Sequence, residues 1–160
     1  MRLSIVSIGR LKEGPERQLL ARYTTLLDGL GRACGIGPLI ITELPEARGG
    51  DTAKRVADEG ARLIKAASGA DVIVLLDERG RSMTSLAFAE AMRRDRDGGV
   101  RNIAFLIGGA DGHGEEARSA AHRTLSLSPL TLPHGLARIM LAEQLYRSVS
   151  IIAGHPYHRE

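Results

Sequence analysis

Short, mainly apolar runs alternate with longer helix-like segments along the 160 residues of this chain. Within the runs, apolar and polar residues do not alternate, which is typical of strands that helices cover on both faces. Repeated strand–helix alternation predicts an α/β fold with a mainly parallel sheet sandwiched by helices. The expected strands lie at residues 3–8, 39–44, 72–76, 103–107 and 124–127.

Local start and stop signals place the helices between these strands. Pro15 suits a first helical turn, and the first helix should break at the glycines that follow its apolar face, at positions 29, 31, 35 and 37. The candidate caps of the next two helices are, in order, Asp51 or Thr52 and Ser82 or Thr84. The last two helices are expected at about 115–121 and 135–152.

The chain is expected to form one domain over residues 1–160, because it has no internal repeat, low-complexity tract or linker. It is long enough to bury a core without disulfides. No apolar run approaches the roughly 18 residues of a membrane helix, and the first residues do not resemble a signal peptide. The single cysteine, Cys34, cannot form an internal disulfide, so the expected location is the reducing cytoplasm.

The charge of the chain is small: 22 Lys and Arg against 19 Asp and Glu give a formal net charge of +3. The densest basic stretch, residues 93–96, is interrupted by Asp95, so there is no basic arm. Aromatic residues make up only 3%, which argues against a platform that stacks single-stranded bases. An RNA partner is permitted but not required, and the candidate contacts are scattered arginines, Arg2, Arg10, Arg22, Arg79, Arg81 and Arg138.

Ligands of parallel α/β sheets bind beyond the carboxyl ends of the strands, which here means the loops after Leu76, Ile107 and Leu127. The turn 108–112, Gly-Gly-Ala-Asp-Gly, is neither a P-loop nor a dinucleotide fingerprint. It either lets backbone approach a ligand or simply makes a tight turn. The loop 126–134 carries no charge except on its last residue, a histidine, so it is either the wall of a mostly apolar pocket or a packed crossover.

The C-terminal residues gather several chemically active side chains, His155, Tyr157, His158 and Arg159. Histidine transfers protons near neutral pH and arginine binds phosphate, so one interpretation is a catalytic or RNA-contacting tail. The other interpretation is a frayed terminus. A metal site is disfavoured, because no cysteine or third clustered ligand accompanies the two histidines.

The remaining polar residues of interest have structural interpretations. His113 and His122 are expected at the protein surface, on or near the short fourth helix. Glu143 and Arg147 stand one helical turn apart on the last helix, so an ion pair between them is favoured over a catalytic role for Glu143.

Several of these segments together resemble one family. They are Ser126-Leu-Ser-Pro-Leu-Thr-Leu-Pro-His134, Glu143-Gln-Leu-Tyr-Arg147, His155-Pro-Tyr-His158, and Phe105-Leu-Ile-Gly-Gly109 with Gly112. With them the chain resembles, over its whole length, the ribosomal RNA large subunit methyltransferase H family of the SPOUT superfamily. Gly135 stands at a position that is expected to vary in this family.

The resemblance implies an enzyme that uses S-adenosylmethionine to methylate N3 of a pseudouridine in helix 69 of 23S rRNA, within the assembled ribosome. It also implies a homodimer without a metal. It implies a C-terminal deep trefoil knot over roughly residues 103–160, which general topology rules would not predict. The cofactor-binding residues that it implies, largely through their backbone groups, are Leu76, Gly108, Gly109, Leu127, Ser128, Pro129, Leu130, Thr131 and Leu132.

For catalysis we expect His158 to take or relay the proton of N3, because N3 must lose that proton and an imidazole titrates near neutral pH. Tyr157 and Arg159 would fix the nucleotide, and one subunit's tail is expected near the other subunit's pocket. Two alternatives remain. One is a SPOUT enzyme that methylates another RNA, such as a tRNA ribose 2′-hydroxyl, and the other is a non-catalytic, ribosome-associated α/β domain.

Overall fold

Five parallel strands form one sheet in the structure, a computed structural model that describes residues 1–158. The strands are β1 (Arg2–Ile8), β2 (Leu39–Leu44), β3 (Val72–Ser82), β4 (Asn102–Ile107) and β5 (Arg123–Ser126). Their order across the sheet is β2-β1-β4-β3-β5, and every neighbouring pair is parallel. The predicted α/β fold with a parallel sheet is confirmed.

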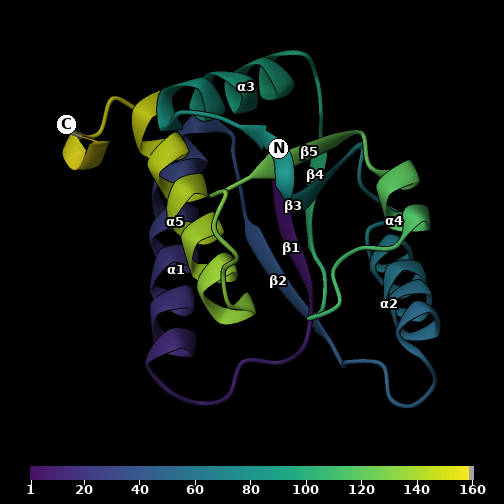
Figure 1. The fold of residues 1–160 in the computed structure, drawn as a ribbon. Coiled ribbons are helices and arrows are strands. Elements are labelled where there is room, and N and C mark those ends of the chain that lie inside the picture. The colour runs from purple at the N-terminus through teal and green to yellow at the C-terminus, as the bar shows by residue number, and fades with distance from the viewer. Residues whose placement is uncertain (159–160) are drawn as a thin grey trace.

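Helices cover both faces of this sheet (Figure 1). On one face lie α1 (Pro15–Cys34), α3 (Ser85–Asp97) and α5 (His134–Ile152), and on the other lie α2 (Thr52–Ala66) and α4 (Glu115–Ala120). A short 3₁₀ helix, η1 (Pro156–His158), follows α5. None of the helices that the structure describes is both long and apolar enough to cross a membrane.

The continuous apolar character of the strands follows from these two helical layers. Ile5 and Phe105 belong to the core cluster under α1, α3 and α5, whereas Val6 and Leu106 belong to the cluster under α2 and α4. Successive side chains of a strand point to opposite faces, so a strand between two helical layers needs apolar residues at consecutive positions. All four of these side chains are 1% exposed or less.

Side-chain caps begin two of the helices where the sequence predicts them. The Asp51 carboxylate accepts a hydrogen bond from the Lys54 N–H at 2.8 Å, at the start of α2. The Thr84 hydroxyl accepts one from the Ala87 N–H at 3.1 Å, at the start of α3. Such caps satisfy backbone N–H groups that have no partner inside the helix.

The first helix is longer than predicted. It passes through Gly29 and Gly31 and ends only at Cys34, where Gly35 adopts a φ of +66°. The expected break is wrong because a glycine inside a helix costs only about 1 kcal/mol, which packing can offset. At Gly31 the absence of a side chain allows the backbone of Ile36 to pack closely, because a Cβ there would collide with the carbonyl of Ile36.

The third strand is also longer than predicted, and it is irregular. The sequence pattern ends it at Leu76, but it continues to Ser82 with a shift of register between Leu76 and Arg81. Both Leu76 and Arg81 pair with Leu125 of β5. Gly80 makes this possible, because a Cβ there would lie 2.8 Å from the carbonyl carbon of Leu125. The irregularity places a charged segment, residues 77–79, at the carboxyl edge of the sheet.

Candidate functional site

A cavity of about 500 Å³ opens beyond the carboxyl ends of β3, β4 and β5. This is the edge at which parallel α/β sheets bind ligands, and the volume lies within the range of small-molecule pockets. Its walls come mainly from residues 76–79 after the regular part of β3, from the turn after β4, and from the loop that joins β5 to α5. The fold therefore brings together the three loops that the sequence singles out.

Nearly all of the residues that the resemblance assigns to a cofactor line this cavity. They are Leu76, Gly108, Gly109, Leu127, Ser128, Leu130, Thr131 and Leu132, whereas Pro129 is not among the lining residues. This placement favours the pocket-wall interpretation of both the Gly-rich turn and the apolar loop. Their role toward a cofactor stays a prediction.

The Gly-rich turn presents bare backbone to the cavity. A Cβ on Gly108 would lie 2.9 Å from the carbonyl oxygen of Gly112 and 3.0 Å from the imidazole of His113. A Cβ on Gly109 would collide with the buried carboxylate of Glu59 from α2. Side chains are excluded on the packed side of the turn, so glycine at both positions is a requirement of the fold.

The apolar loop after β5 is ordered by its own hydroxyl groups. The Ser126 hydroxyl donates to the carbonyl of Ser128 at 3.0 Å, and the Ser128 hydroxyl accepts from the Leu130 N–H at 2.9 Å. The Thr131 hydroxyl donates to the Glu78 carboxylate at 3.2 Å, which joins the loop to the segment after Leu76. Two walls of the cavity are thereby connected.

Charged side chains line one edge of the cavity, and of these the sequence indicates only Arg79, as a candidate contact to RNA. They are Asp77, Glu78, Arg79, Asp111 and Arg118. Burial raises the pKa of Asp77, but hydrogen bonds from the Arg79 N–H and from Arg118, with the charge of Arg118, outweigh it and hold that pKa below its ordinary value. Asp111 forms an ion pair with Arg55 of α2 at 3.0 Å. The only local feature of the sequence that indicates these charged residues is a charged run that follows a buried strand. Within the described residues, no group of carboxylates, histidines or thiols could hold a metal ion.

His113 is not a surface residue, and its predicted exposure is wrong. It lines the cavity half-buried, and its Nε2 donates a hydrogen bond to the carbonyl oxygen of Leu76 at 2.8 Å. Burial lowers the pKa of His113 below its ordinary value, against the raising effects of this hydrogen bond and of the Asp77 charge. The other ring nitrogen, Nδ1, is buried and has no hydrogen-bond partner among the described residues. His122, by contrast, is exposed as expected.

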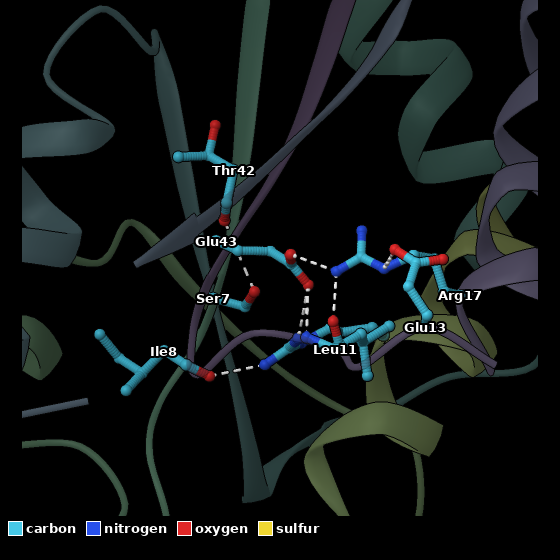
Figure 2. A network of polar contacts seen from close by, with 8 residues as sticks. Ser7, Ile8, Leu11, Glu13, Arg17, Thr42 and Glu43 are labelled. Carbon is cyan, nitrogen blue, oxygen red and sulfur yellow. Dashed lines mark hydrogen bonds and ion pairs between the residues drawn. The ribbon is translucent and has the colours of Figure 1, made fainter. Parts of the chain in front are cut away.

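The first turns of α5, which follow the cavity loop, are anchored by a buried ion pair. Arg138 is 2% exposed and donates to the Glu43 carboxylate at 2.9 Å and to the carbonyl of Ile8 at 2.6 Å. Glu43 also accepts hydrogen bonds from Arg17 at 3.0 Å and from the Leu11 N–H at 2.9 Å (Figure 2). The network joins the carboxyl ends of β1 and β2 to α1 and α5. Its burial excludes Arg138 as an RNA contact in this conformation.

The C-terminal tail packs back on α5. The Tyr157 hydroxyl donates to Glu143 at 3.2 Å, and its ring lies 4.5 Å from the ring of Tyr146 and under the guanidinium of Arg147. The expected ion pair of Glu143 with Arg147 is present, with 3.0 Å between its atoms. Burial, hydrogen bonding with Tyr23 and to the Glu143 carboxylate, and the charge of Glu143 raise the pKa of Tyr157 above its ordinary value.

The tail and the cavity lie at different positions along α5. His134, the first residue of α5, lines the cavity, whereas Glu143, which binds Tyr157, lies about 14 Å further along the helix axis. Figure 1 shows η1 beyond the far end of α5. The structure therefore does not bring Tyr157 to the cavity of its own chain. The side chain of His158 and the whole of Arg159 lie outside the described residues, so their predicted roles stay predictions.

Comparison with known proteins identifies the family. A family model described as predicted SPOUT methyltransferase matches residues 1–158. The chain belongs to this SPOUT methyltransferase family. Its curated relatives include the ribosomal RNA large subunit methyltransferase H of Bradyrhizobium sp. (strain ORS 278), which is 47% identical over 159 residues, 99% of this chain and 98% of that protein. The protein of the same name from Methylobacterium nodulans is 46% identical over the same shares of both chains.

A solved structure shares the fold of this chain at low sequence identity. A probable methylase family protein from Haemophilus influenzae Rd KW20 superposes with a TM-score of 0.54 at 12% identity. The match covers 99% of this chain and 70% of that one. At such low identity the likeness concerns the fold alone. The trefoil knot and the extent of the knotted region remain predictions for this SPOUT chain.

Proposed function

We propose that this chain transfers a methyl group from S-adenosylmethionine to N3 of a pseudouridine in helix 69 of 23S rRNA, acting on assembled ribosomes in the cytoplasm. The observation that carries the proposal is the match to proteins named ribosomal RNA large subunit methyltransferase H, over 99% of the chain. The cavity supports it, because the residues that the resemblance assigns to the cofactor gather there.

The cavity suits S-adenosylmethionine in both size and chemistry. When bound, this cofactor supplies a methyl group on a positively charged sulfur. Three carboxylates but only two guanidinium groups line the cavity, those of Asp77, Glu78, Asp111, Arg79 and Arg118. Asp111 is paired with Arg55 and Asp77 with Arg118, so Glu78 is the lining carboxylate that a cation could approach. The bare backbone of the Gly-rich turn lets a ligand approach closely.

The chain's own contribution to the reaction would be positioning and proton transfer. The ion pair of Asp77 with Arg118 and the anchored start of α5 hold the walls in place. Leucines of the loop would cover the apolar part of a bound cofactor. N3 must lose its proton at or before attack, and we assign that task to His158, with Tyr157 and Arg159 holding the nucleotide.

A homodimer would join the tail of one subunit to the cavity of the other. Tyr157 lies too far along α5 to serve the cavity of its own chain. The packed helices α1 and α5 also carry apolar side chains that are more than a third exposed, Leu19, Leu26, Leu136 and Met140. Apolar surface of this kind is typical of protein–protein contacts.

The assembled ribosome as substrate fits the small charge of the chain. Two chains of +3 each give a dimer of +6, which neutralises few phosphates, so its affinity for free RNA should be low at physiological salt. Shape recognition of a large, folded substrate can supply what charge does not. The dimer offers a wider contact surface for this purpose than a single chain.

Transfer of a labelled methyl group to four acceptors tests the proposal. The acceptors are ribosomes with the pseudouridine, ribosomes without it, free 23S rRNA and tRNA. We expect label only in ribosomes that contain the pseudouridine. Label in tRNA would instead establish the alternative SPOUT activity. Failure to bind S-adenosylmethionine at high micromolar concentration in calorimetry would favour the non-catalytic domain.

A further inference from the structure

We propose that Glu78 and Arg79 bind the two charged groups at the amino-acid end of the cofactor, Glu78 its ammonium and Arg79 its carboxylate. The inference rests on the proposed use of S-adenosylmethionine and adds the residues that select it over ligands without that end. Both side chains line the cavity, directly after Leu76, and they carry opposite charges.

The other ionic groups of the cavity wall are already occupied. Asp77 is held by Arg118, and Asp111 is held by Arg55 at 3.0 Å. Within residues 1–158, the Arg79 side chain forms neither an ion pair nor a hydrogen bond, and only its backbone N–H is bonded, to Asp77. An exposed guanidinium at a cavity wall with no partner in the protein is available for an anionic ligand group.

Glu78 is available in a similar way. Its carboxylate accepts one hydrogen bond, from the Thr131 hydroxyl at 3.2 Å, and forms no ion pair with a described residue. A carboxylate has two oxygens and about four acceptor positions, so one neutral partner leaves room for an ammonium group. The contact with Thr131 also directs the carboxylate across the cavity, between the two walls.

The rest of the cavity wall fixes the direction in which such a ligand would lie. Away from residues 77–79, part of the wall is apolar or bare backbone, from Ile107, Gly108, Leu125, Leu127, Leu132 and Ala137, beside a polar part that includes Asp111, His113 and Arg118. An adenosine ring system suits the apolar part, because its flat faces bury well against leucines and backbone amides can meet its polar edge. The charged end of the ligand then faces Glu78 and Arg79.

Three ligands separate the two contacts in a calorimetric titration of the full chain. They are S-adenosylmethionine, decarboxylated S-adenosylmethionine, which lacks the carboxylate, and 5′-methylthioadenosine, which lacks the whole amino-acid end. For Arg79→Gln we expect affinity for S-adenosylmethionine to fall about tenfold, as for loss of one partly exposed charged contact. Affinity for the other two ligands should stay within about twofold of the wild type.

For Glu78→Gln we expect weaker binding of both ligands that keep the ammonium, and also of S-adenosylhomocysteine, which keeps the ammonium but has a neutral sulfur. Binding of 5′-methylthioadenosine, which lacks both charges, should be unchanged. Glutamine keeps an acceptor for the Thr131 hydroxyl, so the contact between the walls survives. Arg81→Gln is the matched control, because it removes the same charge from the same strand at a position that does not line this cavity. It should bind all three ligands like the wild type.

The outcomes distinguish the inference from the function on which it rests. If the wild type binds neither S-adenosylmethionine nor 5′-methylthioadenosine, the proposed cofactor is wrong and the inference with it. If the wild type binds both, and Arg79→Gln and Glu78→Gln bind S-adenosylmethionine normally, only the inference is overturned. An equal loss for all three ligands would also overturn it, because that result indicates a distorted cavity rather than a lost contact.

Discussion

The imidazole of His113 and the carbonyl group of Leu76 are joined by a hydrogen bond of 2.8 Å between the turn after β4 and the end of the regular part of β3. The carbonyl oxygen can only accept, so Nε2 carries a proton. The ring is neutral when Nδ1 carries no proton and positively charged when it does. Protonation of Nδ1 would keep this hydrogen bond but would place a positive charge in a half-buried position between two walls of the cavity. Asp77, Arg118 and His134 are the charged or titratable groups that face it.

This contact predicts a specific pH dependence of stability. Burial lowers the pKa of His113 in the folded state below the ordinary value of 6.5, so below that pH the unfolded chain binds more protons than the folded one. Stability from this group is therefore complete above about pH 6.5 and is lost as the pH falls through the lowered pKa. We expect the free energy of unfolding to fall more between pH 7.5 and about 5.5 for the wild type than for His113→Gln.

Glutamine is the matched replacement, because its amide can donate to the Leu76 carbonyl but does not titrate in this range. Groups away from His113 contribute equally to the pH dependence of both proteins, whereas the charge of His113 also helps to lower the pKa of Asp77, so the difference between the curves reports His113 together with this coupling. Urea unfolding at several pH values measures the difference. Parallel curves for the two proteins would show that His113 does not carry the effect.

The buried pair of Glu43 and Arg138 predicts a large loss of stability when one charge is removed. Glu43→Gln leaves the Arg138 guanidinium buried without its countercharge, and we expect the free energy of unfolding to fall by about 3 kcal/mol. The exposed pair of Glu90 and Arg93 provides the control. Glu90→Gln should cost less than about 1 kcal/mol. Similar losses for both variants in chemical denaturation would contradict the role assigned to the buried network.

A methyl group added to the Gly-rich turn should weaken binding of the cofactor, whereas one added at a glycine far from the cavity should not. In Gly109→Ala the new Cβ meets the Glu59 carboxylate and the Ile8 side chain, so either the turn shifts or the buried Glu59 carboxylate, which accepts from the Ala47 N–H, is displaced. We expect the thermal shift that S-adenosylmethionine produces in the wild type to disappear. Gly29→Ala, at a helical position with open space around it, should keep the shift and gain about 0.5–1 kcal/mol of stability. A normal shift for Gly109→Ala would show that the turn does not contact the cofactor.

Sharing of sites between two subunits can be measured by mixing two inactive variants. His158→Ala keeps the cavity but loses the proposed proton acceptor, and Gly109→Ala has the opposite defect. In a mixed dimer the intact tail would serve the intact cavity of the other chain, so activity should recover to about a quarter of the wild-type value after random exchange. Each variant alone is the control. If the mixture stays inactive although mixed dimers are shown by mass spectrometry, each tail serves its own chain.

The elements of this fold are largely readable from local sequence, because their determinants lie close together along the chain. Asp51 caps α2 by accepting a hydrogen bond from an N–H only three residues further along the chain. Consecutive apolar residues such as Ile5 and Val6 indicate a strand that is covered on both faces. The errors arose where a distant partner decides the outcome. The helix continues through Gly31 because of how Ile36 packs, and β3 extends past Leu76 because β5 pairs with it again.

The candidate site was predictable only in part, for the same reason. The apolar loop and the Gly-rich turn have unusual local composition, so they could be singled out without a structure. The contacts of His113 with Leu76, of Asp77 with Arg118 and of Ile8 with Arg138 join residues that are 37, 41 and 130 positions apart. Periodicity contains no information about which polar groups meet across such separations.

The anchored start of α5 has a consequence for the energetics of ligand binding. The loop 127–133 begins at a strand that is hydrogen-bonded to β3 and ends at a helix that Arg138 fixes to β1 and β2. With both ends fixed, the loop loses its conformational entropy when the chain folds and not when a ligand arrives. Less of the binding free energy is then spent on ordering the wall, which favours tight association with a small molecule. Changes that loosen this anchor, far from any ligand contact, should therefore weaken binding through an entropic cost.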